Sequence, residues 1–326
     1  MSTNNTKIGS LISQIRQQRG LTQAEFAKRI GTSQSAINRI EQGNQNLSLE
    51  TIGRISDALG RNIVNINTSS SLSFVVNGGR ELSGTISMKS SKNGAVALLA
   101  GSLLNKGTTI LEQVPKIEEV SRLIEVLESI GVKIKWVNGT DLEIKPPNKL
   151  QLDKIDKKSA ERTRSIIMFI GSIMHLEKDF SLPYAGGCHL GKRTIAAHEY
   201  ALEQFGAKIK TVSGKYIVSV KKTSPKEVVM YETSDTATNN ALFAAAYTKG
   251  ITIIRFASSN YMVQDVCLYL RKLGIKIDGI GTPTITVHGH NSVVNKRVKY
   301  RVTEDPLEAM LFITAAIVTN LSLIHI

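Results

Sequence analysis

The sequence predicts two domains of different fold class, an all-α domain at the N-terminus followed by an α/β domain. Near the N-terminus, apolar residues recur at helical spacing and glycines interrupt them, which is typical of short packed helices. From Phe74 onward, short β-rich runs alternate with amphipathic helical stretches. The polar, serine-rich segment 65–73 separates the two patterns and is predicted to be a linker. We therefore place the domains at residues 1–64 and 74–326, and we expect the second to be incomplete.

Composition narrows the class of protein further. The chain has 326 residues, of which 41% are hydrophobic and 21% charged, as in ordinary globular proteins. The apolar runs are shorter than a membrane span, and the polar N-terminus is not a secretory signal. Two cysteines, Cys188 and Cys267, do not make a disulfide framework and indicate a reduced, cytoplasmic setting. The net charge of +14 indicates anionic partners, either nucleic acid or phosphates and nucleotides.

The N-terminal pattern predicts four helices. The first is predicted by apolar residues at i, i+3, i+4 and i+7, namely Ile8, Leu11, Ile12 and Ile15. Thr22 and Glu25 form a capping box that begins a second helix over 23–29. A third helix is predicted over 34–42, and Ser48 is predicted to cap a fourth.

Three segments of this domain, 21–27, 31–37 and 40–43, resemble the Cro/repressor type of helix-turn-helix. The resemblance implies that the third helix enters the major groove of double-stranded DNA. The residues that would then contact base edges or phosphates are Gln34, Ser35, Asn38 and Arg39. An alternative is that the domain only dimerises or tethers the rest of the chain, because this fold also occurs without a regulatory role.

A phrase recurs in the second domain: a predicted helix that ends in leucine, followed by Gly-x-Lys-Ile. It occurs at 131–134, 206–209 and 274–277, so the repeat is roughly 70 residues long. Such a spacing predicts a repeated unit of strands and helices with glycine at the helix end. A fourth unit begins near Val298. The apolar segment 321–326 reads as a strand without a partner, and we therefore expect a truncated chain.

The repeat and three motifs at 91–95, 162–165 and 182–193 resemble the enolpyruvyl transferase family. The resemblance implies an α/β (α+β) inside-out barrel of repeated βαβαββ units, incomplete at its C-terminus. It also implies a cytoplasmic transferase that moves the enolpyruvyl group of phosphoenolpyruvate onto the 3-hydroxyl of UDP-N-acetylglucosamine. That reaction is the first committed step of peptidoglycan synthesis, and so contributes to cell wall biogenesis and cell shape.

The resemblance also implies roles for particular residues. Cys188 would donate a proton and is able to add covalently to phosphoenolpyruvate. Phosphoenolpyruvate would be bound by Lys92, Asn93 and Arg193, and the nucleotide sugar by Arg164, Arg193, Thr194, Ile195 and Ser234. The loop chemistry agrees with this assignment. Gly186, Gly187 and Gly191 permit positive φ and a close approach of backbone to an anion, while His189, Lys192 and Arg193 would lower the pKa of the thiol.

Several segments depart from the family pattern. Residues 193–197 read Arg-Thr-Ile-Ala-Ala where the family usually has Arg-Pro-Val-Asp-Leu, so a carboxylate is absent. Glu232 and Asp235 would repel a diphosphate. Residues 305–308 read Asp-Pro-Leu-Glu in place of Asp-Arg-Ile-Glu. The family's catalytic aspartate and two arginines belong to its second half, so we expect this chain to be catalytically incomplete.

We expect neither a cofactor nor a bound metal. The motif His288-Gly289-His290 lacks a supporting cluster and is predicted to be a loop, and Cys267 is predicted to lie in the core. The expected partners are phosphoenolpyruvate, UDP-N-acetylglucosamine and, through residues 1–64, double-stranded DNA; we expect no membrane partner, and the chain can form a homodimer. Another interpretation is a DNA-binding transcriptional regulator whose enzyme-like domain senses a nucleotide sugar or phosphoenolpyruvate.

Overall fold

The chain forms two compact units in a computed structural model. The first covers Met1–Thr85 with Lys116–Glu118, and the second covers Ile86–Pro115 and Glu119–Ile326. The structure describes residues 3–45, 47, 49–60, 83–186, 194–221, 223–290 and 292–324. The predicted linker at 65–73 therefore lies outside the described residues. In the described ranges, no helix is long and apolar enough to cross a membrane.

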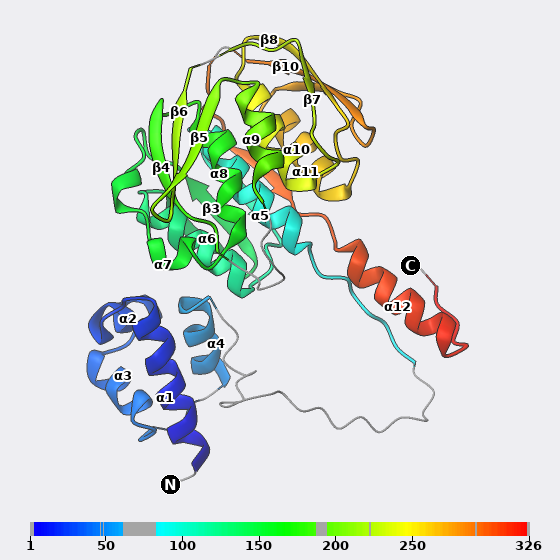
Figure 1. Cartoon of the computed structure of the whole chain (residues 1–326). Coiled ribbons are helices and arrows are strands. Elements are labelled where there is room, and N and C mark those ends of the chain that lie inside the picture. The colour runs from blue at the N-terminus through cyan, green and yellow to red at the C-terminus, as the bar shows by residue number, and fades with distance from the viewer. Residues whose placement is uncertain are drawn as a thin grey trace. The chain divides into compact units, whose positions relative to one another are not determined.

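The N-terminal unit contains the four predicted helices (Figure 1), which are α1 (Thr3–Gln18), α2 (Gln23–Ile30), α3 (Gln34–Glu41) and α4 (Leu49–Ala58). The predicted capping box is confirmed, because Thr22 and Glu25 exchange side-chain and backbone hydrogen bonds at the start of α2. Gly31 ends that helix with φ of 68°, a value that favours glycine. Ser33 caps α3. Ser48, the predicted cap of α4, lies outside the described residues.

A buried ion pair ties α1 to α3. Arg16 Nε lies 2.5 Å from Glu41 Oε1, and Arg16 Nη2 lies 3.0 Å from Glu41 Oε2. Ser13 and Gln23 each donate a further hydrogen bond to Glu41 Oε2, at 2.9 Å in both cases. Around this pair, the apolar core is formed by Ile12, Ile15, Phe26, Ala27, Ile30, Ile37, Ile40, Ile55 and Leu59.

In the described residues, the second unit contains three sheets. The first has the order β11-β1-β3-β2, the second β4-β6-β5 and the third β7-β8-β10-β9. Pairs β1–β11 and β7–β8 are parallel, and the other pairs are antiparallel. The strands are β1 (Thr109–Glu112), β2 (Lys133–Val137), β3 (Asp141–Lys145), β4 (Asp179–Pro183), β5 (Ala207–Val212), β6 (Lys215–Val220), β7 (Glu227–Val229), β8 (Gly250–Arg255), β9 (Lys276–Asp278), β10 (Thr284–Gly289) and β11 (Val298–Arg301).

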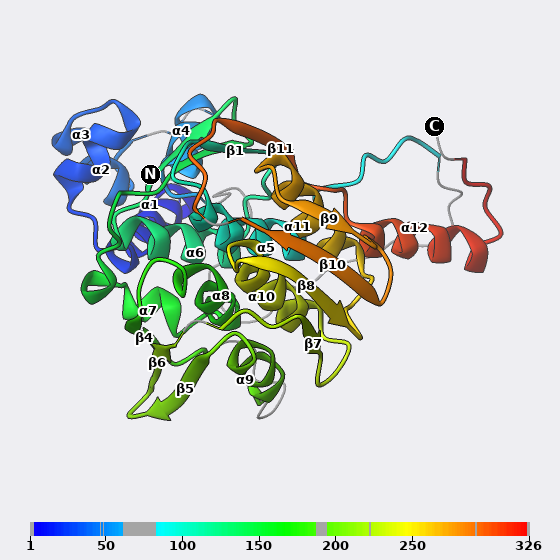
Figure 2. The same ribbon diagram turned by 90° about the horizontal axis from the view of Figure 1, so that it is seen from above.

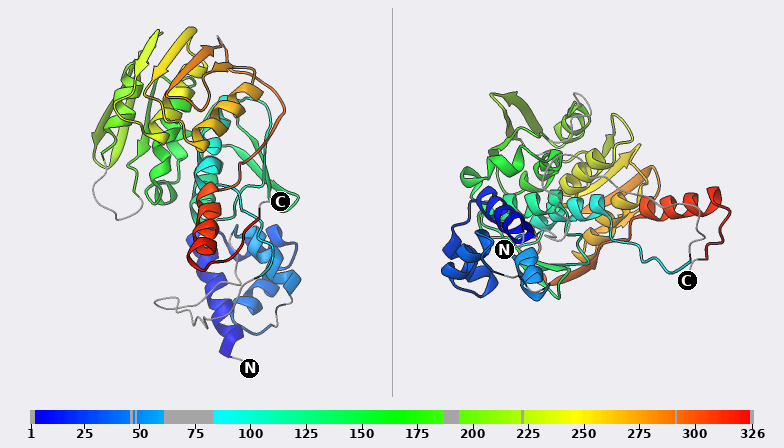
Figure 3. Two further views of the ribbon diagram at one scale, coloured as in Figure 1. Left: turned by 90° about the vertical axis from the view of Figure 1, so that its right-hand side faces the viewer. Right: turned by 90° about the horizontal axis from the view of Figure 1, so that it is seen from below.

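Helices fill the space between these sheets, as Figures 2 and 3 show from three further sides. Helices α5 and α10 are rich in small residues, and they are buried on all sides over residues 94–101 and 237–246, which is typical of core helices. They pack on each other and on α11. The helices are α5 (Lys92–Gly101), α6 (Glu118–Ser129), α7 (Lys157–Ala160), α8 (Phe169–Ile173), α9 (Ala196–Glu203), α10 (Asp235–Ala246), α11 (Tyr261–Lys272) and α12 (Pro306–Val318), with 3-10 turns η2 (Ser102–Leu104), η3 (Leu152–Lys154) and η4 (Arg164–Met168).

The three glycines of the recurring phrase all adopt positive φ between a helix and a strand. Gly131, Gly206 and Gly274 have φ of 93°, 87° and 97°, which L side chains rarely adopt. Each is therefore required by the turn that follows α6, α9 or α11. The repeat as a family pattern, and the inside-out barrel, stay predictions.

Two local predictions were wrong, and one was confirmed. His288 and Gly289 belong to strand β10 instead of a loop, and His288 Nε2 lies 3.0 Å from Asp278 Oδ2 on the neighbouring strand. Residues 321–324, expected to be strand-like, lie outside any helix or strand. Cys267 is fully buried as predicted, and its burial raises the pKa of the thiol to about 12.

Candidate active site

A pocket of about 360 Å³ lies where α5, η4, α10 and α11 meet. Its lining includes Asn93, predicted to contact phosphoenolpyruvate, and Ser234, predicted to contact the nucleotide sugar. The two residues are far apart in sequence. The fold thus brings one predicted residue for each substrate to the same cavity.

The first turn of α5 explains how Lys92 and Asn93 are positioned. Ser91 caps the helix, because its Oγ accepts from the amide of Gly94 at 3.1 Å and lies 2.9 Å from the Tyr261 hydroxyl. Gly94 allows close packing, since an added Cβ would lie 2.7 Å from Asp265 Oδ2. The sequence Ser-Lys-Asn-Gly therefore supplies a cap, two site residues and a close contact in order.

Lys92 is paired with a carboxylate from another segment. Its Nζ lies 2.8 Å from Glu119 Oε2, and the Lys92 side chain is 48% exposed. Glu119 Oε1 also accepts from Ser165 Oγ at 2.6 Å and from Thr163 Oγ1 at 3.2 Å. Burial acts to raise the pKa of Glu119, but these hydrogen bonds and the charge of Lys92 outweigh it, so the pKa is lowered. An anionic ligand at Lys92 would therefore compete with a carboxylate that stays ionised.

Arg164, Thr194 and Ile195 lie together but not in this pocket. Arg164 Nη2 donates to the carbonyl of Thr194 at 2.9 Å, and Thr194 Oγ1 accepts from the amide of Ala196 at 3.1 Å. Ile195 precedes α9 and makes no side-chain cap. Arg164 thus holds the described end of the loop that precedes α9. Of the six predicted substrate-contacting residues that the structure describes, only Asn93 and Ser234 line the cavity.

The glycine-rich loop itself is outside the described residues from 187 to 193. Cys188 and Arg193, together with Gly187, His189, Gly191 and Lys192, lie in that range. Gly186 is described, and it does not use the positive φ that a glycine permits. A glycine is required at this position because the backbone of Glu161 lies close by, and an added Cβ would be 1.5 Å from its carbonyl oxygen.

The N-terminus of α10 presents negative charge to the pocket. Both Glu232 and Asp235 line it. Asp235 Oδ1 accepts from Ser258 Oγ, and its Oδ2 accepts from Asn260 Nδ2 at 3.1 Å. Ser234 caps α10, because its Oγ accepts from the amide of Ala237 at 3.4 Å. A carboxylate of the chain therefore already occupies the helix end that usually favours a bound anion.

A buried histidine that the sequence analysis missed stands behind this helix end. His198 on α9 is 4% exposed; its Nε2 lies 3.2 Å from Thr236 Oγ1 and its Nδ1 lies 2.9 Å from Asn240 Nδ2. Burial lowers its pKa to about 4, with a smaller contribution from the charge of Arg164. His198 is neutral at pH 7. Its helical spacing from the buried Ala201 and Leu202 is the signal that could have placed it on the buried face of α9.

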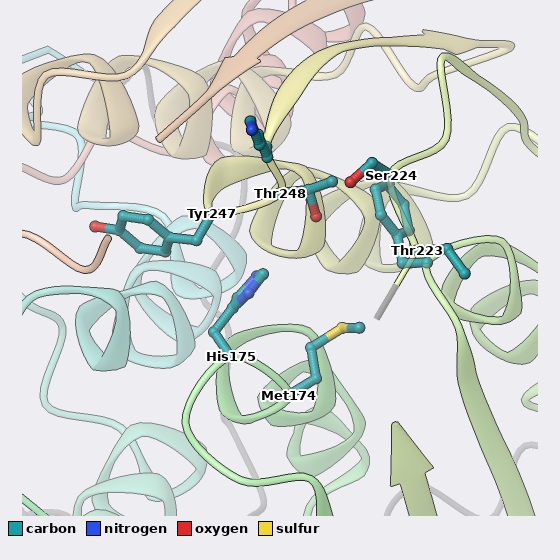
Figure 4. Close-up of a pocket in the computed structure, with 8 residues that line it drawn as sticks. Met174, His175, Thr223, Ser224, Tyr247 and Thr248 are labelled. Atoms are coloured by element: carbon teal, nitrogen blue, oxygen red, sulfur yellow. The ribbon is translucent and has the colours of Figure 1, made fainter. Parts of the chain in front are cut away.

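A second cavity, also of about 360 Å³, lies at the other end of α10. Figure 4 shows Tyr247 and Thr248 on one side of it, and Met174 and His175 on another. His175 Nε2 lies 2.9 Å from the carbonyl oxygen of Phe243. None of the predicted site residues that the structure describes lines this cavity.

In the N-terminal unit, the four predicted DNA-contacting residues are all exposed on α3: Gln34, Ser35, Asn38 and Arg39. The other face of α3 is buried through Ala36, Ile37 and Ile40. The amphipathic pattern thus leaves the four polar side chains on the solvent side of the helix.

Solved structures establish the fold of the second unit. The chain is similar to the enolpyruvyl transferase NikO from Streptomyces tendae, with a TM-score of 0.60 and 19% identity, over 73% of this chain and 56% of that one. It is also similar to EPSP synthase from Acinetobacter baumannii, with a TM-score of 0.55 and 16% identity, over 72% of this chain and 52% of that one. The second unit therefore has the enolpyruvyl transferase type of α/β fold.

Sequence families and relatives specify this class further. Residues 76–326 match the family described as EPSP synthase (3-phosphoshikimate 1-carboxyvinyltransferase), and residues 12–65 match the helix-turn-helix family. The chain belongs to the EPSP synthase family and carries a helix-turn-helix domain at its N-terminus. Curated relatives are UDP-N-acetylglucosamine 1-carboxyvinyltransferases from Bradyrhizobium diazoefficiens (34% identical) and Treponema denticola (32%), each matched over 76% of this chain. This chain spans 57% of the length of each of these relatives.

Proposed function

We propose that the second unit takes part in transfer of the enolpyruvyl group from phosphoenolpyruvate to the 3-hydroxyl of UDP-N-acetylglucosamine. The observation that carries the proposal is the shared pocket, in which Asn93 from α5 and Ser234 from the start of α10 line one cavity. Ser165 also lines the cavity and donates to Glu119, which in turn pairs with Lys92, so the cation lies beside the lining and is not part of it. The names of the curated relatives support the same reaction.

The proposed chemistry is an addition followed by an elimination. A base removes the proton of the sugar 3-hydroxyl, the oxygen adds to C2 of phosphoenolpyruvate, and Cys188 gives a proton to the C3 methylene. Loss of a proton from C3 and of phosphate from C2 then restores the double bond on the transferred group. Lys92 and Arg193 would bind the phosphate and carboxylate, while Arg164, Thr194 and Ile195 would support the nucleotide-sugar side.

The proposal is tested by phosphate release from phosphoenolpyruvate and UDP-N-acetylglucosamine. We expect no measurable release from the 326-residue chain, because the family's acidic base and later arginines belong to the part of the relatives that this chain does not match. A longer chain that carries the corresponding part should release phosphate, and Cys188→Ala in it should abolish release. Rapid turnover by the 326-residue chain would contradict the assignment of catalytic groups to that part.

Thiol reactivity tests the assignment of Cys188 separately. The Cys267 thiol is buried and its pKa is raised to about 12, so it is a matched internal control of low reactivity. We expect iodoacetamide to label Cys188 at least about a hundredfold faster than Cys267 at pH 7, as read by peptide mass spectrometry. Equal labelling rates would remove Cys188 from the proposed mechanism.

A second function, DNA binding by the N-terminal unit, is favoured by the exposure of Gln34, Ser35, Asn38 and Arg39 on one face of α3. A regulator that senses phosphoenolpyruvate or a nucleotide sugar would use the same face. We expect the full chain to bind a random-sequence DNA duplex at low salt, with an affinity that falls as salt rises. Arg39→Ala should reduce the salt slope by about one, whereas Arg54→Ala, at an exposed position on α4, is the matched control. Equal effects of the two variants would favour a tethering role.

A further inference from the structure

Asn239 lies in the buried part of the pocket lining, on the first turns of α10. It is 0% exposed. Its Oδ1 and Nδ2 atoms have no hydrogen-bond partner within the described part of the chain. A buried carboxamide without partners lowers the free energy of unfolding, so such a side chain needs an explanation.

The next residue gives a direct contrast. Asn240 is also 0% exposed, but every polar atom of its side chain is bonded. Its Oδ1 accepts from the amide of Gly171 at 3.1 Å, and its Nδ2 donates to the carbonyl of Ile167 at 3.0 Å and lies 2.9 Å from His198 Nδ1. Asn240 thus holds the core together, whereas Asn239 contributes no such bond to the described structure.

The surroundings of Asn239 define which chemical group would satisfy it. The other buried lining residues are apolar: Val96, Met168 and Met262. The charged lining residues are Glu232 and Asp235, and among the described lining residues none is cationic. A phosphate beside Asn239 would meet these two carboxylates and no cation among the described lining residues, because Lys92 is already paired with Glu119. The group that reaches Asn239 is therefore uncharged, with both a hydrogen-bond donor and an acceptor to match the carboxamide.

Thr236 also lines the pocket, one turn before Asn239 on α10. The hydrogen bonds behind it determine that its hydroxyl acts as a donor toward the pocket. Because Asn240 Oδ1 accepts from Gly171, its Nδ2 is the atom that donates to His198 Nδ1. His198 must then carry its proton on Nε2 and donate it to Thr236 Oγ1. The hydroxyl hydrogen of Thr236 is left to donate to a ligand.

We propose that Asn239 is a ligand-binding residue that pairs with an amide group of the enolpyruvyl acceptor, with Thr236 as a second donor beside it. The inference rests on the proposed function, because it assigns part of the same pocket to the acceptor. Two parts of a uridine-diphosphate amino sugar contain this chemistry, the acetamido group of the sugar and the imide of the pyrimidine. The diphosphate that joins them is excluded from this part of the pocket.

The test compares Asn239→Leu with Asn240→Leu in the full chain. Leucine has nearly the shape of asparagine, so Asn239→Leu removes an unpaired amide and should raise the Tm by about 2–4 °C. Asn240→Leu should lower the Tm, because it removes the bonds to His198 Nδ1, the Ile167 carbonyl and the Gly171 amide. Trp136 is the only tryptophan of the chain, so its fluorescence follows the second unit.

Binding of UDP-N-acetylglucosamine, N-acetylglucosamine and uridine by isothermal titration completes the test. We expect Asn239→Leu to lower the affinity for UDP-N-acetylglucosamine by about tenfold or more. If Asn239→Leu also lowers the affinity for N-acetylglucosamine, the acetamido group contacts Asn239. If it lowers the affinity for uridine instead, the pyrimidine does. Asn239→Ala is the second variant, for which the same loss of affinity is expected.

Three results overturn the proposal. A lower Tm for Asn239→Leu would mean that the carboxamide has a partner within the folded chain. Unchanged affinity in both Asn239 variants would mean that no ligand contacts it, and would leave the proposed transfer standing. If the parent chain binds none of the three ligands, the amide assignment is overturned. If it binds them but does not bind phosphoenolpyruvate, only the proposed transfer is overturned.

Discussion

Each unit of the chain contains a carboxylate held by one cation and two neutral side-chain donors. In the helix-turn-helix unit, Glu41 is bound by Arg16, Ser13 and Gln23, and the paired side chains are 6% and 9% exposed. In the enolpyruvyl transferase unit, Glu119 is bound by Lys92, Ser165 and Thr163, with side-chain exposures of 27% for Glu119 and 48% for Lys92. In both, the pKa of the carboxyl is lowered in spite of burial.

The difference between the two lies in the cation. Arg16 is planar, bidentate and buried, so its charge has no access to a ligand and its role is to hold α1 against α3. Lys92 is a point charge on a side chain that is 48% exposed, so an anion from solution can replace Glu119 as its partner. The same arrangement therefore stabilises one unit and leaves a usable charge in the other.

The largest expected effect comes from breaking the buried pair. Arg16→Met leaves Glu41 buried without its cation and should lower the free energy of unfolding of the helical unit by about 3–5 kcal/mol. Urea unfolding of the full chain, followed by far-UV circular dichroism, measures this loss. The fluorescence of Trp136 in β2 is the control and should not shift. Recovery of much of the loss by adding Glu41→Leu would identify the uncompensated charge as the cause, and an unchanged transition would refute the pair's role.

The same pair predicts a pH dependence of stability. Because the pKa of Glu41 is lower in the folded than in the unfolded chain, its stabilisation is complete above the ordinary value of 4.5 and is lost as the pH falls through the folded value. The free energy of unfolding of the helical unit should therefore decrease as pH falls below about 4.5. Glu25, whose pKa is also lowered, acts in the same direction. Arg16→Met with Glu41→Leu should flatten the profile measured from pH 3 to 7; a profile as steep as the parent's would contradict the assignment to Glu41.

Removing the exposed cation should affect ligand binding. Lys92→Met should weaken phosphoenolpyruvate binding by about tenfold or more, because a charge-assisted hydrogen bond is lost. Isothermal titration of the full chain measures the change. Lys249→Met, which removes an exposed lysine from the second cavity, is the matched control and should leave the affinity unchanged. Equal losses in both variants would assign the effect to overall charge.

The smallest effect is expected for the stability of the second unit in Lys92→Met. The pair is half exposed, and Glu119 keeps its bonds from Ser165 and Thr163, so the free energy of unfolding should fall by less than about 1 kcal/mol. Urea unfolding followed by Trp136 fluorescence measures it. A loss as large as that for Arg16→Met would erase the distinction between the two pairs.

Local sequence signals predicted the local structure well. The capping box at Thr22 and the helix-ending glycines could be predicted because each depends on residues within one turn. The placement of Asn93 and Ser234 was implied by family resemblance, and both line the pocket. The loop prediction at His288 failed because the pairing of β10 with β8 and β9 outweighs the local preference of glycine.

The residues that sequence reasoning missed all act across distant segments. Glu119 meets Lys92, and His198 meets Thr236, only after the sheets and central helices have assembled. Asn239 and Asn240 are adjacent and identical in type, yet one is fully bonded and the other is not. No local pattern distinguishes them, because their partners are set by tertiary packing.

Gly186 has a consequence for genetics. Every other amino acid carries a Cβ, and a Cβ at this position would lie 1.5 Å from the carbonyl oxygen of Glu161. All missense alleles at this codon therefore share one defect, whatever the chemistry of the new side chain. A screen for inactive alleles would return this codon as uniformly intolerant, in the manner of a catalytic residue, although its only requirement is the absence of a single carbon atom.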